Sequence, residues 1–574
     1  MTRSLAELVV LARAWIDGDP DASTRAELSV LVDAGDSEAL DERMHPLSFG
    51  TAGLRGAVGA GSGRMNSAVV TRTAYGIARY LKDLPGSASA PIVIGFDARP
   101  TSRGFAEISA GVLLAAGFAV VAFSSPTATP LCAFLGRELG ASITIVVTAS
   151  HNPRGDNGYK VYGPAAVQIV SPLDAEIARQ IAEAPPARQV PHQLLSFDQS
   201  PPAGLTLLDP ARLDAYFAAV SAAIPARSAT RDLPIVHSAL HGVGTAPMLR
   251  TLADAGFSRV DVVTAQAEPD GSFPTTPFPN PEEPGTLDLA LAEAERRGAA
   301  LLLVNDPDAD RLAAAARLDG VLAVLDGNQV GALLADYTLS LRGGSPTPLV
   351  LSSVVSSPLV ALLAASRGAH YERTHTGFKW LWTAALELER RAVGQFCFAY
   401  EEALGYSVFP AVRDKDGIAA GRALAELAAL QAARGATLFD RLYELYAEHG
   451  LWASAARNLA LHAADAGARV AQRLDALCTQ PALDVGGQPV TRVVDYRSRT
   501  GERAPWLGAA PLLELELEDS SRLFVRPSGT EPKLKLYAHV KRNITHRSDL
   551  ARDLAAARSS AAALLQSLAS ALQL

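Results

Sequence analysis

A polar loop, Thr148-Ala149-Ser150-His151-Asn152-Pro153, follows the apolar run Ser142-Ile143-Thr144-Ile145-Val146-Val147. The apolar run predicts a buried strand, and the polar residues predict a loop at the strand's end. This loop places a hydroxyl beside an imidazole, and Lys160 follows Ser150 by ten residues. Such an arrangement suits a serine that handles an anion. Because a serine after a strand also often acts only as a cap, the rest of the chain has to decide between the two interpretations.

The chain has 574 residues, which at roughly 150 residues per domain predicts about four domains. Its 48% hydrophobic and 20% charged residues are typical of a globular protein, and its net charge of -8 argues against a general nucleic-acid-binding surface. No window approaches the roughly 18 uninterrupted apolar residues of a membrane span. We therefore expect neither a nucleic acid nor a membrane as a partner.

The three cysteines, Cys132, Cys397 and Cys478, lie far apart and form no CxxC pair. They indicate neither a disulfide framework nor a zinc ribbon, and they fit a reducing compartment. Residues 1–13 carry charges inside their apolar stretch and show no small-residue cleavage site, which argues against a signal peptide. We expect a cytoplasmic protein.

Apolar β runs alternate with helical patterns along most of the chain. Helices are expected over 5–16 and within 24–44, and the runs at 91–97 and 142–147 flank a helical pattern at 105–116. Such alternation favours a largely parallel sheet covered on both faces. The pattern restarts near Leu233, after a proline-rich stretch, and again near Asp326.

The last part of the chain differs in character. Beyond Gly450 the sequence favours helix to Ala476, then short alternating segments that favour antiparallel strands, and a final helix over 548–574. We expect an α/β protein of three consecutive α/β domains with mixed, largely parallel sheets, followed by a smaller C-terminal α+β domain. The predicted domains are residues 1–200, 201–325, 326–450 and 451–574.

A second polar loop, Asn305-Asp306-Pro307-Asp308-Ala309-Asp310-Arg311, follows the apolar run 299–304. Three carboxylates at alternate positions repel one another unless a cation neutralises them, and hard oxygen ligands suit Mg²⁺. The buried strand before the loop weakens the alternative of an exposed acidic turn, and the loop lacks the glycine of an EF-hand. His237 and His241 also have a spacing that a metal pair can use, but their surroundings favour an ordinary loop.

Further polar loops follow other predicted strands. Each of them, taken alone, is compatible with an exposed turn: Phe49-Gly50-Thr51-Ala52-Gly53-Leu54-Arg55-Gly56, Thr374 to Lys379, Tyr400 to Gly405, Asp414 to Gly417 and Arg526 to Lys533. Open α/β sheets bind ligands at the carboxyl ends of their strands. We therefore expect the serine, aspartate, Glu401-Glu402 and Arg526 loops to share one central cleft.

This combination of motifs resembles the α-D-phosphohexomutase family, and most closely its phosphoglucomutase-2-like branch, from Phe49 to about Val540. By this resemblance Ser150 carries the transferred phosphoryl group, and Asp306, Asp308 and Asp310 hold Mg²⁺ together with an oxygen of the phosphorylated serine. Lys160 is then the first choice as general acid or base, with His151 and Lys415 behind it. Arg55 and Arg311 match positions that the family uses near the reacting phosphate.

The resemblance also implies how the substrate is held. Glu401 is expected to bind the sugar ring together with Thr376, Gly377 and Lys379, while Arg526, Ser528, Gly529 and Thr530 hold the phosphate that does not react. The common family pattern Gly-Glu-x-Ser is replaced here, with Tyr400 for the glycine and Ala403 for the serine. One hydroxyl contact is lost, which leaves the preferred sugar open.

The implied activity is that of an isomerase that interconverts glucose 1-phosphate and glucose 6-phosphate, with glucose 1,6-bisphosphate as primer and sugar phosphates as partners. The alternatives are a phosphopentomutase, a phosphomannomutase and a glucose-1,6-bisphosphate synthase. A phosphatase and a non-catalytic sugar-phosphate-binding protein are alternatives from other classes; the phosphorylatable serine beside a metal triad argues against both. The sequence leaves open whether the protein is a monomer or a homodimer, and how far Ser150 is phosphorylated.

Overall fold

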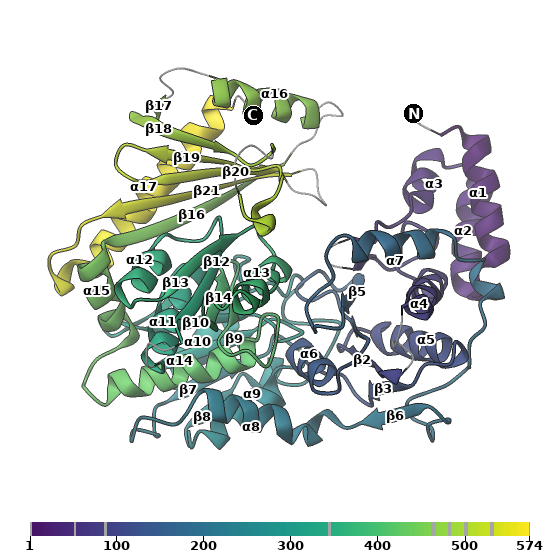
Figure 1. The fold of residues 1–574 in the computed structure, drawn as a ribbon, viewed down its shortest axis with the longest axis horizontal. Coiled ribbons are helices and arrows are strands. Elements are labelled where there is room, and N and C mark those ends of the chain that lie inside the picture. The colour runs from purple at the N-terminus through teal and green to yellow at the C-terminus, as the bar shows by residue number, and fades with distance from the viewer. Residues whose placement is uncertain are drawn as a thin grey trace. The chain divides into compact units, whose positions relative to one another are not determined.

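The computed structural model describes residues 3–50, 53–84, 89–342, 346–460, 466–479, 484–498, 503–527 and 533–572. The chain forms two compact units (Figure 1). The first comprises Met1–Ala315 and Gly405–Glu426, and the second comprises Ala316–Leu404 and Leu427–Leu574. The segment Gly405–Glu426 is therefore a short excursion from the second unit into the first.

The first unit begins with a helical arm. Its helices start at well-formed caps, among them a capping box between Ser4 and Glu7, and Leu8, Leu28 and Leu40 form a small core of their own. The helices predicted from the sequence are confirmed here. The arm consists of α1 (Leu5–Gly18), α2 (Ala22–Ala34) and α3 (Ser37–Met44).

The first sheet has the strand order β1-β5-β4-β2-β3-β6. Its central strands β2 and β4 are mostly apolar and are buried along their whole length, because helices cover both faces. β2, β3, β4 and β6 are parallel, whereas β5 is antiparallel to β4 and β1 to β5. The elements are β1 (Leu54–Ala57), α4 (Ser67–Lys82), β2 (Ile92–Phe96), α5 (Ser102–Ala115), β3 (Val120–Phe123), α6 (Thr129–Glu138), β4 (Ile143–Val147), β5 (Asp156–Tyr162), α7 (Leu173–Ala182) and β6 (Leu205–Leu208).

Within this unit the strands of the second sheet follow the order β10-β9-β7-β8, and β7 is parallel to both β8 and β9. The predicted strand before the aspartate loop is β9, and the loop joins β9 to β10. The elements are α8 (Asp214–Ala223), β7 (Ile235–Ser238), α9 (Thr245–Asp254), β8 (Val260–Val262), α10 (Asp288–Arg296), β9 (Leu301–Asn305) and β10 (Leu312–Leu318), and the excursion carries β15 (Gly405–Ser407) and the start of α14 (Gly417–Ala432).

The second unit contains a parallel sheet in the order β13-β12-β14 and an antiparallel sheet in the order β16-β21-β20-β19-β18-β17. The first set of elements is β11 (Val321–Leu325), α11 (Gly327–Ser340), β12 (Pro348–Ser353), α12 (Leu359–Ser366), β13 (His370–Thr374), α13 (Phe378–Arg390), β14 (Gln395–Glu401) and α15 (Leu438–His449). The C-terminal set is β16 (Leu451–Ala460), α16 (Ala466–Thr479), β17 (Asp484–Val485), β18 (Gln488–Asp495), β19 (Leu513–Leu517), β20 (Arg522–Pro527), β21 (Lys533–Arg542) and α17 (Leu550–Ala571).

The predicted fold class, α/β with mixed sheets and a smaller C-terminal domain, is confirmed, but two local predictions are wrong. Residues 451–460, predicted as helix, form strand β16, because all ten residues pair with β21, and long-range pairing overrides the helical preference of an alanine-rich segment. Leu54, Arg55 and Gly56, predicted as part of a loop, lie in strand β1, which forms the edge of the sheet and pairs antiparallel with β5. The sheet also extends to Leu208, beyond the boundary expected at residue 200.

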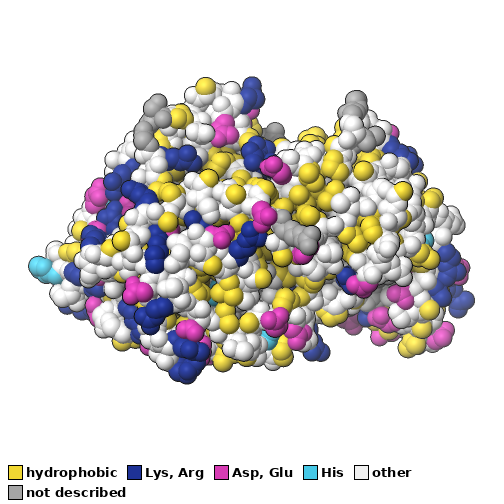
Figure 2. All heavy atoms as spheres, turned by 90° about the horizontal axis from the view of Figure 1, so that it is seen from below, with side chains coloured by type: hydrophobic (Ala, Val, Ile, Leu, Met, Phe, Trp, Pro, Cys, Tyr) yellow, Lys and Arg dark blue, Asp and Glu magenta, His cyan; other side chains and the backbone are white. Residues whose placement is uncertain are grey.

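None of the described helices combines the length and the apolar character needed to cross a bilayer. On the face drawn in Figure 2, basic and acidic side chains are interspersed and do not form a continuous basic field.

Candidate active site

The serine loop is held in a fixed conformation at the end of β4. Ser150 is buried and adopts a left-handed backbone with φ of 51°, which is uncommon outside glycine. Its amide donates to Thr148 Oγ1 at 2.8 Å, and the Thr148 hydroxyl donates to Asp97 Oδ2 at 2.7 Å. The strained serine is therefore positioned through a chain of buried hydrogen bonds.

Arg99 secures the same loop from the end of β2. Its buried guanidinium donates to the carbonyls of Ser150 and Asn152 at 2.8 and 2.6 Å, and also to those of Pro153 and Asp156 at 2.7 and 2.9 Å. Its Nε lies 3.2 Å from Asp97 Oδ2. Asp97 and Arg99 were not predicted as site residues from the sequence, although Asp97 is the last residue of a predicted strand and Arg99 follows that strand.

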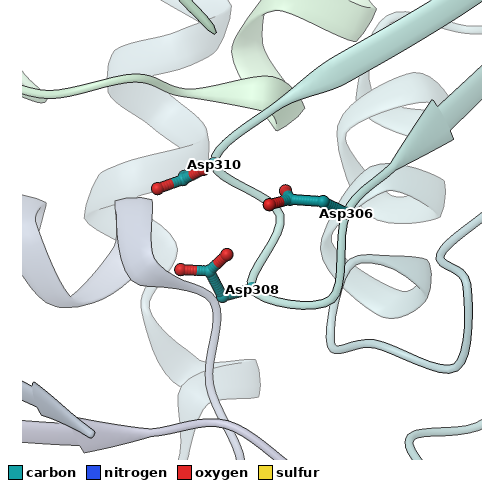
Figure 3. Close-up of side chains that lie close together, drawn as sticks. All are labelled: Asp306, Asp308 and Asp310. Carbon is teal, nitrogen blue, oxygen red and sulfur yellow. The ribbon is translucent and has the colours of Figure 1, made fainter. Parts of the chain in front are cut away.

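Three carboxylates converge in the loop between β9 and β10 (Figure 3). Asp306, Asp308 and Asp310 are buried, and one oxygen of each lies within 4.8 Å of the others. Asp308 Oδ1 and Asp310 Oδ1 are buried without a hydrogen-bond partner among the described residues. Orphaned carboxylate oxygens at this density fit a hard cation, so this triad could bind a metal ion.

The serine loop contacts the aspartate loop through the side chain of Ser150. Ser150 Oγ donates to Asp306 Oδ2 at 2.7 Å and lies 3.1 Å from His151 Nδ1. Asp308 is tied to the N-terminus of α6, since its carbonyl accepts from the Thr129 amide and its Oδ2 accepts from the Thr129 hydroxyl at 2.6 Å. Thr129 is a further site residue that was not predicted from the sequence, because 179 residues separate it from Asp308.

Two lysines face the same carboxylates. Lys160 Nζ lies 2.7 Å from both Asp308 Oδ2 and Asp310 Oδ2, and Lys415 Nζ lies 3.1 Å from Asp310 Oδ2. Burial lowers the pKa of Lys160, but the attraction of Asp308 and Asp310 outweighs it and raises that pKa above its ordinary value. Lys160 is therefore protonated at neutral pH.

The carboxyl groups of the triad differ strongly in pKa. Burial, followed by the repulsion of Asp308 and Asp310, raises the pKa of Asp306 to about 8. Burial also raises the pKa of Asp310, but the attraction of Lys160, Lys415 and Arg311 outweighs it and leaves that pKa well below its usual range. Without a bound cation, Asp306 is thus the carboxyl of the triad that carries a proton.

The remaining predicted residues of this group also lie in the first unit. Arg55 Nη1 donates to Asn152 Oδ1 at 3.0 Å, and the Arg311 amide donates to Asp306 Oδ1 at 3.0 Å. Burial, Arg311 and Arg55 together hold the pKa of His151 well below its usual value, so the imidazole is neutral. His237 and His241 have separate partners, Asn305 Oδ1 at 3.0 Å and Thr275 Oγ1 at 2.8 Å.

The predicted sugar-binding residues lie in the second unit. Glu401 is the last residue of β14, and its Oε1 accepts from the Gly377 amide at 2.6 Å, at the start of α13. Lys379 lies in the first turn of α13. The structure thus brings the Glu401 strand end and the Thr376–Lys379 loop together.

The two residues on either side of Glu401, Tyr400 and Glu402, have structural partners. The hydroxyl of the buried Tyr400 donates to Asn328 Oδ1 at 3.1 Å. The Tyr400 ring packs so closely on Gly331 that a Cβ added to this glycine would lie 2.5 Å from the ring atom Cδ2. Glu402 accepts from the Ser353 and Ser356 hydroxyls at 2.9 and 3.0 Å. Tyr400 therefore packs against α11, where Gly331 leaves room for it.

Of the predicted phosphate-binding residues, Arg526 lies in β20, opposite Lys535 of β21. Ser528, Gly529 and Thr530 lie outside the described residues.

Comparison with known families gives consecutive matches along the chain. They carry the descriptions phosphoglucomutase/phosphomannomutase alpha/beta/alpha domain I at residues 46–188, domain II at 214–319, domain III at 326–449, and C-terminal domain at 501–557. The chain belongs to the phosphoglucomutase/phosphomannomutase family. It is an enzyme of the phosphoglucomutase type, and the membership predicted from its motifs is confirmed.

Curated relatives of this phosphoglucomutase/phosphomannomutase family member carry several substrate names. A probable phosphoribomutase of Schizosaccharomyces pombe is 35% identical over 92% of each chain. The phosphopentomutase of Homo sapiens is 34% identical and covers 92% of this chain and 90% of its own. A phosphoglucomutase of Staphylococcus aureus (strain N315) is 30% identical, covering 92% and 95%. The relatives therefore agree on the family, but the sugar phosphate in their names differs from one relative to the next.

Among solved structures, a putative phosphomannomutase from Thermus thermophilus matches with a TM-score of 0.68. It is 21% identical and the match covers 92% of this chain and 100% of the other. This likeness supports the fold.

Proposed function

We propose that the protein is a phosphosugar mutase that interconverts glucose 1-phosphate and glucose 6-phosphate through a phosphorylated Ser150. The observation that carries the proposal is the position of Ser150 Oγ, 2.7 Å from Asp306 Oδ2 and beside three converging carboxylates. A serine hydroxyl buried against a cation site suits phosphoryl transfer, which depends on positioning and charge neutralisation more than on covalent assistance.

Asp306, Asp308 and Asp310 would hold Mg²⁺, which supplies charge neutralisation on the transferring phosphoryl group. In the first transfer the sugar hydroxyl attacks phosphorus, the bond from phosphorus to Ser150 Oγ breaks, the sugar hydroxyl proton passes to a base, and Ser150 Oγ takes up a proton. After the sugar 1,6-bisphosphate turns in the site, Ser150 Oγ gives up that proton and attacks the other phosphorus, the bond from this phosphorus to the sugar oxygen breaks, and the sugar oxygen takes up a proton. The second transfer restores the phosphoserine.

The residues around the serine supply the proton transfers. Lys160 is the first choice for the general acid or base, and its raised pKa suits the form that donates a proton. His151, kept neutral next to Ser150 Oγ, suits the form that accepts one. Lys415 is the third candidate, while Arg55 and Arg311 add positive charge around the phosphate.

Residues of the second unit would hold the rest of the substrate. Glu401 accepts hydrogen bonds from sugar hydroxyls, with Thr376, Gly377 and Lys379 at its side. Arg526 pairs with the phosphate that does not react, since guanidinium and phosphate match through paired hydrogen bonds, and Ser528, Gly529 and Thr530 complete that site. Glucose 1,6-bisphosphate primes the serine. We propose a cytoplasmic enzyme, a monomer or a homodimer, without a nucleic-acid or membrane partner.

A second candidate function is favoured by one observation. Ala403 offers no hydroxyl beside Glu401, and the relatives at 34 and 35% identity are named phosphopentomutase and phosphoribomutase. The same machinery would then act on ribose or deoxyribose phosphates. Phosphomannomutase and glucose-1,6-bisphosphate synthase activities stay as further outcomes of the same test.

A substrate panel tests the proposal. Glucose, mannose, ribose and deoxyribose 1-phosphates are offered with Mg²⁺ and glucose 1,6-bisphosphate, and the isomer formed is measured. We expect glucose 6-phosphate to form with the highest kcat/KM, and turnover to depend on the primer. Higher kcat/KM for the pentose phosphates would favour the second candidate. Release of inorganic phosphate without isomer would identify a phosphatase, and binding without turnover would contradict an enzyme.

The raised pKa of Asp306 predicts a pH-dependent effect of Mg²⁺ on stability. The native state holds the Asp306 proton more tightly than the unfolded chain, whose carboxyl titrates near 3.9. The resulting stabilisation is complete below about pH 4 and is lost as pH rises through about 8. Asp308 and Asp310, whose pKa values are lowered, stay ionised across this upper range. Because Mg²⁺ displaces the Asp306 proton, it should stabilise the protein more at high pH.

The measurement is the melting temperature with Mg²⁺ and with a chelator, at about pH 6 and about pH 9. We expect the difference between the two conditions to be larger at the higher pH. An equal difference at both values would contradict the protonation of Asp306 in the metal-free protein.

A further inference from the structure

The excursion Gly405–Glu426 places Lys415 beside the aspartate loop of the first unit. Gly405 and Gly417, which flank the part of this segment that contains Lys415, both contact the aspartate loop. Gly405 forms a β-bridge with Arg311, and the Gly417 amide donates to the Ala309 carbonyl at 3.2 Å. A Cβ on Gly417 would lie 2.2 Å from the Arg311 carbonyl oxygen, so the backbones approach too closely for any other residue.

Lys415 lies between two buried carboxylates. Its Nζ is 3.1 Å from Asp310 Oδ2 and 3.1 Å from Asp414 Oδ1, and its amide donates to the same Asp414 oxygen at 2.7 Å. A lysine side chain has many rotamers, and holding its ammonium at one point therefore requires partners that fix it. Asp414 binds both the backbone and the side chain of Lys415.

The second oxygen of Asp414 is held by Tyr162 of β5 and by Gln168, which follows that strand. The Tyr162 hydroxyl donates to Asp414 Oδ2 at 2.6 Å, and Gln168 Nε2 donates to it at 3.0 Å. Tyr162 and Asp414 are both fully buried, and Tyr162 and Gln168 are joined by a β-bridge. Lys160 and Tyr162 lie two residues apart on β5 and so share one face of the strand.

We propose that Tyr162, Gln168 and Asp414, together termed the Asp414 clamp, are positioning residues that hold the Lys415 ammonium at the reacting phosphate. The inference rests on the proposed mutase function. In this account β5 supplies one lysine directly, through Lys160, and fixes a second one, Lys415, through the clamp. Strand β5 thereby aligns a lysine that lies 255 residues further along the chain than Lys160 (415 − 160).

The same strand offers a matched control. Tyr159 is also fully buried, and its hydroxyl donates one hydrogen bond, to Ser109 Oγ at 2.9 Å. It lies on the opposite face of β5 from Lys160 and Tyr162. Tyr159→Phe and Tyr162→Phe each remove one buried hydroxyl and one hydrogen bond, but only Tyr162→Phe weakens the Asp414 clamp.

The experiment combines these variants with Lys415→Met. We expect Tyr162→Phe to lower kcat by roughly tenfold with little change in KM, because a small displacement of a catalytic group reduces the rate without weakening binding. Tyr159→Phe should leave kcat within about twofold, with a similar melting temperature. In the Lys415→Met background, Tyr162→Phe should cause no further loss, as expected for residues that act through one group.

A second readout does not depend on turnover. The rate at which an acetylating reagent modifies Lys415 is followed by peptide mass spectrometry. We expect this rate to rise in Tyr162→Phe and to stay unchanged in Tyr159→Phe. Equal acetylation rates in the two variants, or an equal loss of kcat from Tyr162→Phe with and without Lys415, would overturn the proposal. Absence of mutase turnover in the unmodified protein would instead contradict the proposed function, and the acetylation rates would still decide on the clamp.

Discussion

Replacing Ser150 with alanine should abolish mutase turnover, with a loss of roughly 10⁴-fold or more, because the covalent carrier of the phosphoryl group is removed. Sugar-phosphate binding should persist, since Glu401 and Arg526 are unchanged. The alanine also removes the hydrogen bond from Ser150 Oγ to Asp306. The measurements are primed turnover and the dissociation constant for glucose 6-phosphate by calorimetry.

Ser142→Ala is a suitable control for this variant. Ser142 lies just before the same strand, and its hydroxyl makes only a long contact of 3.4 Å with the Pro91 carbonyl. This variant should keep full turnover. Turnover of Ser150→Ala at the level of Ser142→Ala would exclude a phosphoserine mechanism.

The second large effect is expected for Asp308→Asn. Asparagine keeps the size of the side chain and an oxygen that can accept from Thr129 and Lys160, but it removes one negative charge from the triad. We expect Mg²⁺ affinity to fall by roughly 100-fold or more. This loss exceeds the one expected for changing a residue that only hydrogen-bonds to a metal ligand. Turnover should fall by roughly 10³-fold, because charge on the transferring phosphoryl group is no longer neutralised.

Metal affinity is measured by titration with Mn²⁺ as a spectroscopic probe, and turnover is measured at saturating Mg²⁺. The matched control is Asp336→Asn, which changes a buried aspartate of α11 that is paired with Arg441 of α15. If Asp308→Asn bound Mn²⁺ as tightly as this control, the triad would not be the metal site.

The parts of the site that the sequence predicted share one physical cause. Short, largely apolar runs rich in β-branched residues or leucine precede Ser150 and Asp306 and favour buried strands, and the polar residues after them lie at the ends of those strands. The same reasoning identified the strand that ends at Glu401. It could not show that Lys160 contacts Asp308 and Asp310, because a single lysine in a polar loop has no pattern that distinguishes it from an exposed one.

The parts that the sequence did not predict depend on long-range contacts. Arg99 is a lone arginine after a strand, and its role becomes visible only when its four carbonyl partners are in place. Tyr162 and Asp414 are 252 residues apart. The strand Leu451–Ala460 was predicted as helix because its alanines favour helix locally, whereas its partner β21 decides the conformation. The domain boundaries and the shared cleft stay predictions.

The central claim, that Ser150 carries the phosphoryl group, is tested most directly by intact mass before and after incubation with glucose 1,6-bisphosphate and Mg²⁺. We expect a gain of about 80 Da, the mass of one phosphoryl group, that maps to Ser150 and is absent in Ser150→Ala. A protein whose mass does not change at any stage of primed turnover, or a phosphoryl group on another residue, would contradict it.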